Sequence, residues 1–169
     1  MNGFFAFFRT IDRILVPILK VAVLVLGLFV AFTIVIGIVA RSVFDVSLFG
    51  SEELILVAAI WLYMLGATLA SRERTHLGGE FVQMFIENKK LSRAIKVVAA
   101  FVSLAMAFFF LICAFIFVSW SIDLSPVTPV FGMPRYIAQS SLLVASVLMF
   151  SYAIKDFIKD VVRYQKVKS

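Results

Sequence analysis

Four long apolar stretches, separated by polar segments, dominate the chain. They cover residues 21–40, 54–71, 97–122 and 136–154, and none contains an acidic residue, a basic residue or a histidine. A helix needs about 20 apolar residues to cross the hydrocarbon core of a bilayer. Backbone groups in lipid must bond within their own segment, which favours helices over open strands. The pattern predicts an all-α membrane protein with four transmembrane helices in a single membrane domain, residues 1–169.

The outer ends of two spans carry local signals for a helix start. Ser51 is suited to cap the second span, which places Glu52 and Glu53 at the positive end of its dipole. The segment 125–134 contains three prolines and a glycine, which exclude a regular helix there. Pro134 is suited to begin the fourth span, because a proline in the first helical turn loses no hydrogen bond.

Positive charge is distributed very unevenly over the segments between the spans. Fourteen of the 16 Lys and Arg residues lie in the N-terminal segment, the central loop and the C-terminal tail. The other two loops hold only Arg41 and Arg135. Basic residues accumulate on the cytoplasmic side of membrane proteins, so both termini and the central loop are predicted to be cytoplasmic. The net charge of +6 is thus a topology signal and an attraction to anionic lipids, with no nucleic-acid partner implied.

The central loop has a helical pattern of its own over residues 77–86. Leu77, Phe81, Val82 and Phe85 fall on one helical face, with polar residues largely opposite. Such a pattern is typical of a short amphipathic helix that lies on the cytoplasmic membrane surface. The alternative is a polar loop that happens to contain apolar residues.

Composition argues against an enzyme. The chain is 63% hydrophobic and 15% charged, with one cysteine, Cys113, and one histidine, His76. A zinc or haem site needs a cluster of such ligands, and a phosphate-binding loop needs glycines that are missing here. Ion-coupled carriers keep charged or interrupted segments within the membrane. No cofactor is expected in this chain, because it lacks a ligand cluster. Any ion coupling is expected in a partner, because the spans of this chain contain no charged residue.

Several residues are candidates for contacts with other proteins. Glu52 and Glu53 bind a partner, form a substrate gate or compensate the helix dipole, and Arg41 is placed to pair with one of them. In the second span Gly66 and Ala70 form a small-xxx-small pair that permits close helix contact, either inside the bundle or with another membrane protein.

A set of short motifs in a fixed order resembles a known family. An arginine closes the first span, an acidic pair begins the second, a glycine–alanine pair and a basic cluster ending in histidine follow, and prolines mark the last outer loop. These motifs are Arg41–Asp45, Ser51–Leu54, Trp61, Gly66–Ala67, Arg72–His76, Thr128–Pro129 and Met133–Pro134. Together they are similar to the small membrane subunit of tripartite ATP-independent periplasmic (TRAP) transporters. Phe49–Gly50 departs from this family, which often has a tryptophan before the acidic pair.

The resemblance implies a division of labour in the bacterial inner membrane. A periplasmic binding protein captures an organic acid such as a dicarboxylate or a sialic acid, and a large membrane subunit holds the sodium and substrate sites. The small subunit braces the large one, and the residues expected at that contact are Arg41, Glu52, Glu53, Trp61, Gly66 and Ala70. The residues expected to help receive the binding protein are Asp45, Asp123 and Arg135.

Two other classes of protein fit the sequence less well. An autonomous four-helix exporter is the main alternative, but small exporters of that kind carry a glutamate in the first span, and residues 21–40 have none. A membrane enzyme or redox subunit would need ligands or nucleophiles that the spans lack.

Overall fold

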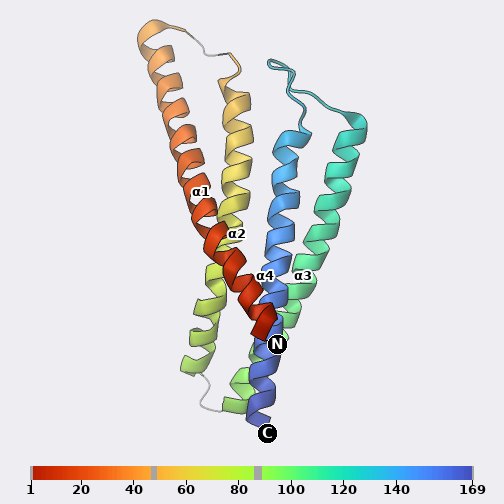
Figure 1. Cartoon of the computed structure of the whole chain (residues 1–169). Helices are drawn as coiled ribbons and strands as arrows, with labels where there is room; N and C mark the ends of the chain where they lie inside the picture. Colours follow the sequence, from red (N-terminus) through yellow and green to blue (C-terminus); the bar gives the residue numbers. More distant parts are fainter. Residues whose placement is uncertain (1, 47–48, 86–88, 169) are drawn as a thin grey trace.

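The chain folds into four long helices that run alternately up and down (Figure 1). The computed structural model describes residues 2–46, 49–85 and 89–168, with side chains for 12–46, 49–72, 91 and 95–162. The helices are α1 (Asn2–Phe44), α2 (Ser51–Phe85), α3 (Lys89–Leu124) and α4 (Tyr136–Lys168).

Each helix contains a stretch long and apolar enough to cross a membrane. These stretches are Asp12–Phe44, Ser51–Arg72, Ile95–Leu124 and Tyr136–Val162. The four predicted spans lie within them, so the prediction of an all-α protein with four membrane-spanning helices is confirmed. A helix of 43 residues, as in α1, is about 65 Å long, roughly twice the hydrocarbon thickness. The helices therefore extend well beyond the membrane core.

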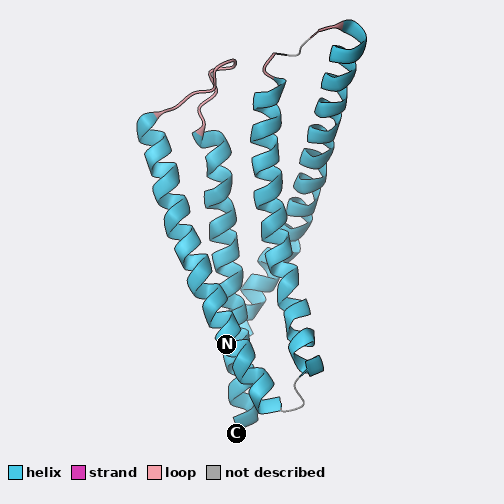
Figure 2. Cartoon of the chain, turned by 180° about the vertical axis from the view of Figure 1, so that it is seen from behind, coloured by secondary structure: helices cyan, strands magenta, loops and turns pink. Residues whose placement is uncertain are grey.

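The helices are arranged in the spatial order α1, α2, α4, α3. Helix α4 packs against α2 on one side and α3 on the other, and α1 packs against α2. Both termini lie at the same end of the bundle as the α2–α3 connection, while the α1–α2 and α3–α4 connections lie at the opposite end (Figures 1 and 2). We call these the inner and outer ends, after the predicted orientation, which stays a prediction.

The amphipathic segment predicted at residues 77–86 is helical as far as Phe85, and residue 86 lies outside the described residues. It forms the last turns of α2 and is continuous with the membrane-spanning part of that helix. Its contact with the membrane surface stays a prediction.

Small side chains fill the interior of the bundle, while bulky ones point outward. The buried residues include Ala58 and Thr68 on α2, Ala114 on α3, and Ala145 on α4. Without a hydrophobic driving force in lipid, helices associate through close van der Waals contact, which small residues permit. The exposed aromatic residues of α3 are Phe101, Phe108, Phe109, Phe115, Phe117 and Trp120. The packing is that of a bundle whose outer surface is apolar.

Most hydroxyl groups inside the spans bond to the carbonyl groups of their own helix. The hydroxyl of Thr68 donates to the carbonyl oxygen of Met64 (2.9 Å), and that of Ser141 donates to the carbonyl oxygen of Ala138 (2.7 Å). These local bonds satisfy polar groups that would otherwise be costly in a dry interior. Ser121 on α3 differs, because its buried hydroxyl has no hydrogen-bond partner among the described residues.

The orientation of the bundle is testable with single cysteines in a Cys113→Ala background. Val46 and Val127 are exposed at the outer end, and Leu91 is exposed near the inner end. We expect an impermeant thiol reagent added to intact spheroplasts to label Val46→Cys and Val127→Cys but not Leu91→Cys, because the basic segments stay in the cytoplasm. Labelling of Leu91→Cys before permeabilisation would reverse the assigned orientation.

Candidate functional site

The outer end carries the two connections that contain most of the predicted contact residues. Helix α1 ends where Asp45 adopts a left-handed conformation with φ 51°, and the amide of Val46 donates to the carbonyl oxygen of Ala40 (3.2 Å). Aspartate is one of the few residues that tolerate this backbone region. Helix α3 ends similarly at Ser125, whose φ is 44° and whose amide donates to the carbonyl oxygen of Ser121 (3.1 Å).

The α3–α4 connection is a compact hairpin-like loop. Its two arms meet at an isolated antiparallel bridge between Val127 and Pro134. Inside the bridge, the Thr128 amide donates to the carbonyl oxygen of Met133 (2.9 Å), and the Gly132 amide donates to the carbonyl oxygen of Thr128 (3.1 Å). Gly132 has φ 62°, which a glycine adopts without steric cost. We call residues 125–135 the outer hairpin.

Glu53, in the first turn of α2, binds the tip of the outer hairpin. The amide of Val130 donates to Oε1 of Glu53 (2.8 Å), and the amide of Phe131 donates to Oε2 (3.1 Å). The Thr128 side chain and the positive charge of Arg135 lie near the same carboxylate and favour its ionised form. Successive backbone N–H groups form a concave site for an anion. Here the anion is the carboxylate of Glu53, which comes from α2, while the hairpin connects α3 and α4.

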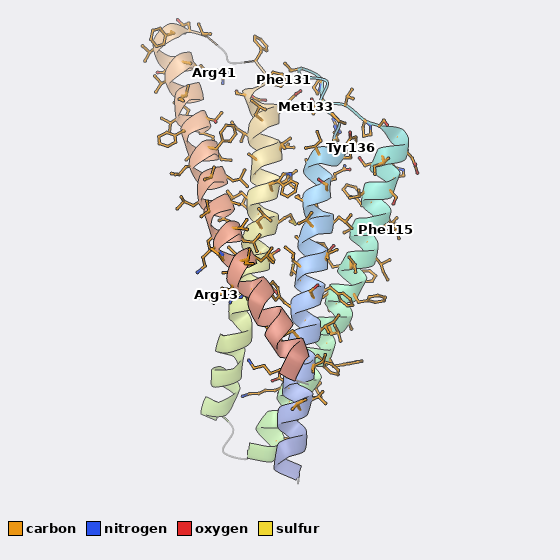
Figure 3. The ribbon with its side chains drawn as sticks, viewed as in Figure 1. Arg13, Arg41, Phe115, Phe131, Met133 and Tyr136 are labelled. Atoms are coloured by element: carbon orange, nitrogen blue, oxygen red, sulfur yellow. The ribbon has the colours of Figure 1, made fainter. Side chains whose placement is uncertain are left out.

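Gly50 provides the second contact between the two outer connections. Two features favour a glycine at this position. Its φ is 89°, and a Cβ built there would lie 2.4 Å from Cε2 of Phe131. Phe131 therefore packs directly over the Gly50 backbone, at the place where the outer hairpin meets the top of α2 (Figure 3). The carbonyl oxygen of Gly50 also accepts the amides of Glu53 and Leu54, which begins the helix.

The residues predicted to receive the binding protein are all exposed at the outer end. Asp45 and Asp123 lie where α1 and α3 end, and Arg135 directly precedes α4. Glu52 is exposed as well, on the first turn of α2. Arg41 is exposed on α1, and no ion pair joins it to Glu52 or Glu53 within the described part of the chain.

The predicted contact residues of the second span fall into two groups. The indole Nε1 of Trp61 donates to the carbonyl oxygen of Ile137 (3.0 Å), which ties α2 to the first turns of α4 inside the bundle. Gly66 and Ala70 have a different environment. No neighbouring atom lies within 4 Å of a Cβ built at Gly66, and Ala70 is exposed. This small-residue side of α2 is thus open within the chain, whereas Trp61 is engaged.

Sequence reasoning missed a charged contact near the inner end. Lys155 on α4 forms an ion pair with Oδ2 of Asp12 on α1, and both side chains are largely shielded, with exposed fractions of 23% and 12%. The buried hydroxyl of Tyr152 lies beside Asp12. The signal in the sequence is weak, since Asp12 is separated from Lys155 by 143 positions and each residue resembles an ordinary residue flanking a membrane span.

The fold and these contacts define a multi-pass α-helical membrane protein whose polar contacts gather at its two ends. The sequence model of the DctQ component of the tripartite ATP-independent periplasmic transporters matches residues 30–163. The chain belongs to this family, as its motifs indicate, and is a small membrane subunit of a TRAP transporter. A comparison with curated proteins gave no match.

The Asp12–Lys155 ion pair is expected to hold α1 against α4. Removal of one partner leaves a poorly solvated charge, so Asp12→Leu or Lys155→Met should each lower the unfolding free energy in detergent by about 1–3 kcal/mol. The double variant should lose less than the sum of the two, because it leaves no unpaired charge. Arg13→Met, at the exposed neighbouring position, is the control. Losses no larger than that of the control, or strictly additive losses, would contradict a coupled pair.

Proposed function

We propose that the chain is the accessory membrane subunit of a secondary transporter that imports an organic acid across the bacterial inner membrane. The observation that carries this proposal is the family match over residues 30–163, which includes most of the four spans. The organic acid belongs to the carboxylates that a periplasmic binding protein delivers. Transport is performed jointly, with sodium coupling and substrate binding in the large subunit.

The sequence of the spans supports this division of labour. The predicted spans contain no acidic, basic or histidine side chain, whereas carriers that couple transport to ions place such groups or broken helices near the middle of the membrane. Most hydroxyls in the spans are used for bonds within their own helices, as at Thr68 and Ser141. A chain built in this way is suited to support a partner that holds the transport site.

The contact with the large subunit is assigned to the open side of α2 and the exposed apolar face of α1. Gly66 and Ala70 leave room beside α2 for another helix. Glu52 and Arg41, both exposed near the outer end, are assigned to the same contact. Trp61 contributes indirectly, because its bond to Ile137 fixes α2 against α4.

The contact with the binding protein is assigned to the outer end. Asp45, Asp123 and Arg135 are exposed there, next to the outer hairpin. A surface that is already ordered loses little conformational entropy when it binds, which suits it to repeated docking. Charges at the rim of such a contact mainly affect encounter rate and its salt dependence.

Reconstitution in liposomes tests the accessory role. We expect sodium-driven uptake of an organic acid only when the chain, the large subunit and the binding protein are all present, because the spans of this chain offer no site for ion coupling. The measurement is uptake of labelled acid with each component omitted in turn. Uptake or export by this chain alone would instead favour the autonomous exporter, and full uptake without this chain would remove the accessory role.

Charge reversal at Asp123 tests the docking assignment. Asp123→Lys should raise the binding-protein concentration for half-maximal uptake about threefold to tenfold at low salt, because a complementary rim charge becomes repulsive. The shift should shrink at high salt, since exposed charges are screened. Co-purification of the two membrane subunits should not change. An unmoved uptake curve at both salt concentrations would assign docking to the large subunit alone.

A further inference from the structure

Two outer connections that are remote in sequence are held together by one side chain. The α1–α2 connection leads into Glu53, and the tip of the outer hairpin is 77 and 78 positions further along the chain. We infer that Glu53 is a positioning residue, whose carboxylate fixes the outer hairpin in the shape that the binding protein recognises. The inference rests on the proposed function and deepens it, because it names the group that orders the docking surface.

The geometry of the carboxylate supports a fixing role. Each of its oxygens accepts one backbone amide, from Val130 at 2.8 Å and from Phe131 at 3.1 Å. Hydrogen bonds to an ionised carboxylate are roughly twice as strong as neutral ones. Two such bonds to consecutive residues fix both the position and the direction of the tip. The hairpin's own hydrogen bonds join residues 126, 128, 132, 133 and 135, so the bonds to Glu53 are the ones that hold the amides of Val130 and Phe131 at the tip.

Packing at Gly50 supports the same conclusion independently. Phe131 lies so close to the Gly50 backbone that an added Cβ would meet its ring at 2.4 Å and 2.8 Å. The ring covers this contact on one side and is still 51% exposed. With Val130 and Phe49, which are 53% and 84% exposed, it forms an apolar outer patch. Glu53 and Gly50 thus position the two apolar residues at the tip of the hairpin.

The patch is flanked by the charges already assigned to docking. Asp123 lies in the last turn of α3, just before the outer hairpin, and the amide of Arg135 donates to the carbonyl oxygen of Pro126 (2.9 Å) at the base of the hairpin. An apolar centre with a charged rim is the common arrangement of a protein–protein contact. The partner that fits it is a soluble protein with an apolar contact and rim charges, reached from the outer side. Without the Glu53 carboxylate, Val130 and Phe131 at the centre of the patch would lose their fixed positions, while the rim charges of Asp123 and Arg135 would remain.

The first test measures the hairpin directly, without transport. Glu53→Gln exchanges one acceptor oxygen for an NH₂ donor, so that one of the two amides loses its acceptor. In the assembled membrane complex, hydrogen exchange of the peptide containing Val130 and Phe131 should accelerate at least about tenfold, because those amides lose protection. Leu124→Gln is the control, since Leu124 is exposed at the end of α3 next to the outer hairpin and has no part in the Glu53 contact. Its exchange should equal that of the wild type.

A second pair of variants tests the packing contact. Gly50→Ala places a methyl group against the ring of Phe131, while Gly132→Ala has a comparable left-handed backbone and no atom within 4 Å of the added Cβ. Both substitutions place a Cβ on a backbone with positive φ, and only Gly50→Ala also displaces the ring. We expect faster exchange at the tip for Gly50→Ala than for Gly132→Ala. Co-purification with the large subunit verifies that each variant assembles.

The docking consequence is measured by uptake against binding-protein concentration. Glu53→Gln should raise the half-maximal concentration about fivefold with little change in the maximal rate, because a disordered tip must be ordered again at each encounter. Unchanged hydrogen exchange in Glu53→Gln overturns the inference whatever the uptake curve shows. Accelerated exchange with an unmoved curve also overturns it, because the order of the hairpin then has no effect on docking. Failure of the proposed function is distinguishable, since it would appear in the wild-type complex as uptake that does not need this chain.

Discussion

The rest of the structure depends on one constraint, which is that polar groups within a membrane must find their partners inside the protein. The backbone meets it by forming helices that cross the membrane without interruption, and most hydroxyls within the spans meet it by bonding to the preceding turn, as at Thr68 and Ser141. Polar contacts between segments are consequently found near the ends of the predicted spans. Glu53 with the outer hairpin and Asp12 with Lys155 are such contacts, just outside the outer and inner ends of those spans.

The same constraint determines how the helices pack. Water provides no driving force for helix association within lipid, so contact depends on how closely two backbones approach. Alanine and serine therefore occupy the interior positions, such as Ala114 and Ser146, while the phenylalanines of α3 point outward. The bond from Trp61 to the carbonyl oxygen of Ile137 adds a directional contact between α2 and α4 near the outer end. The exposed apolar surface that results is available to lipid and to a partner subunit alike.

The fold could be predicted well from sequence because its signal is local. Each span is a continuous apolar run, and the outer boundaries coincide with residues that act on their own neighbourhood, such as Pro134 before α4 and the Ser51 start of α2. At their inner ends the helices extend beyond the predicted spans, because a helix that leaves the membrane continues into water without a marker. Thus α2 continues through the segment that looked like a separate amphipathic helix.

The contacts of the site were not predictable, because they join positions far apart in the chain. Glu53 was expected to bind a partner, to form a substrate gate or to compensate the helix dipole, and nothing near it in sequence indicates the two amides that it binds. Gly50 illustrates the difference most clearly. In the sequence it marks a departure from the family pattern, where a tryptophan is common, but in the structure its missing side chain makes room for the ring of Phe131. The ring of Phe131, which comes from the outer hairpin, therefore lies against the chain just before the start of α2.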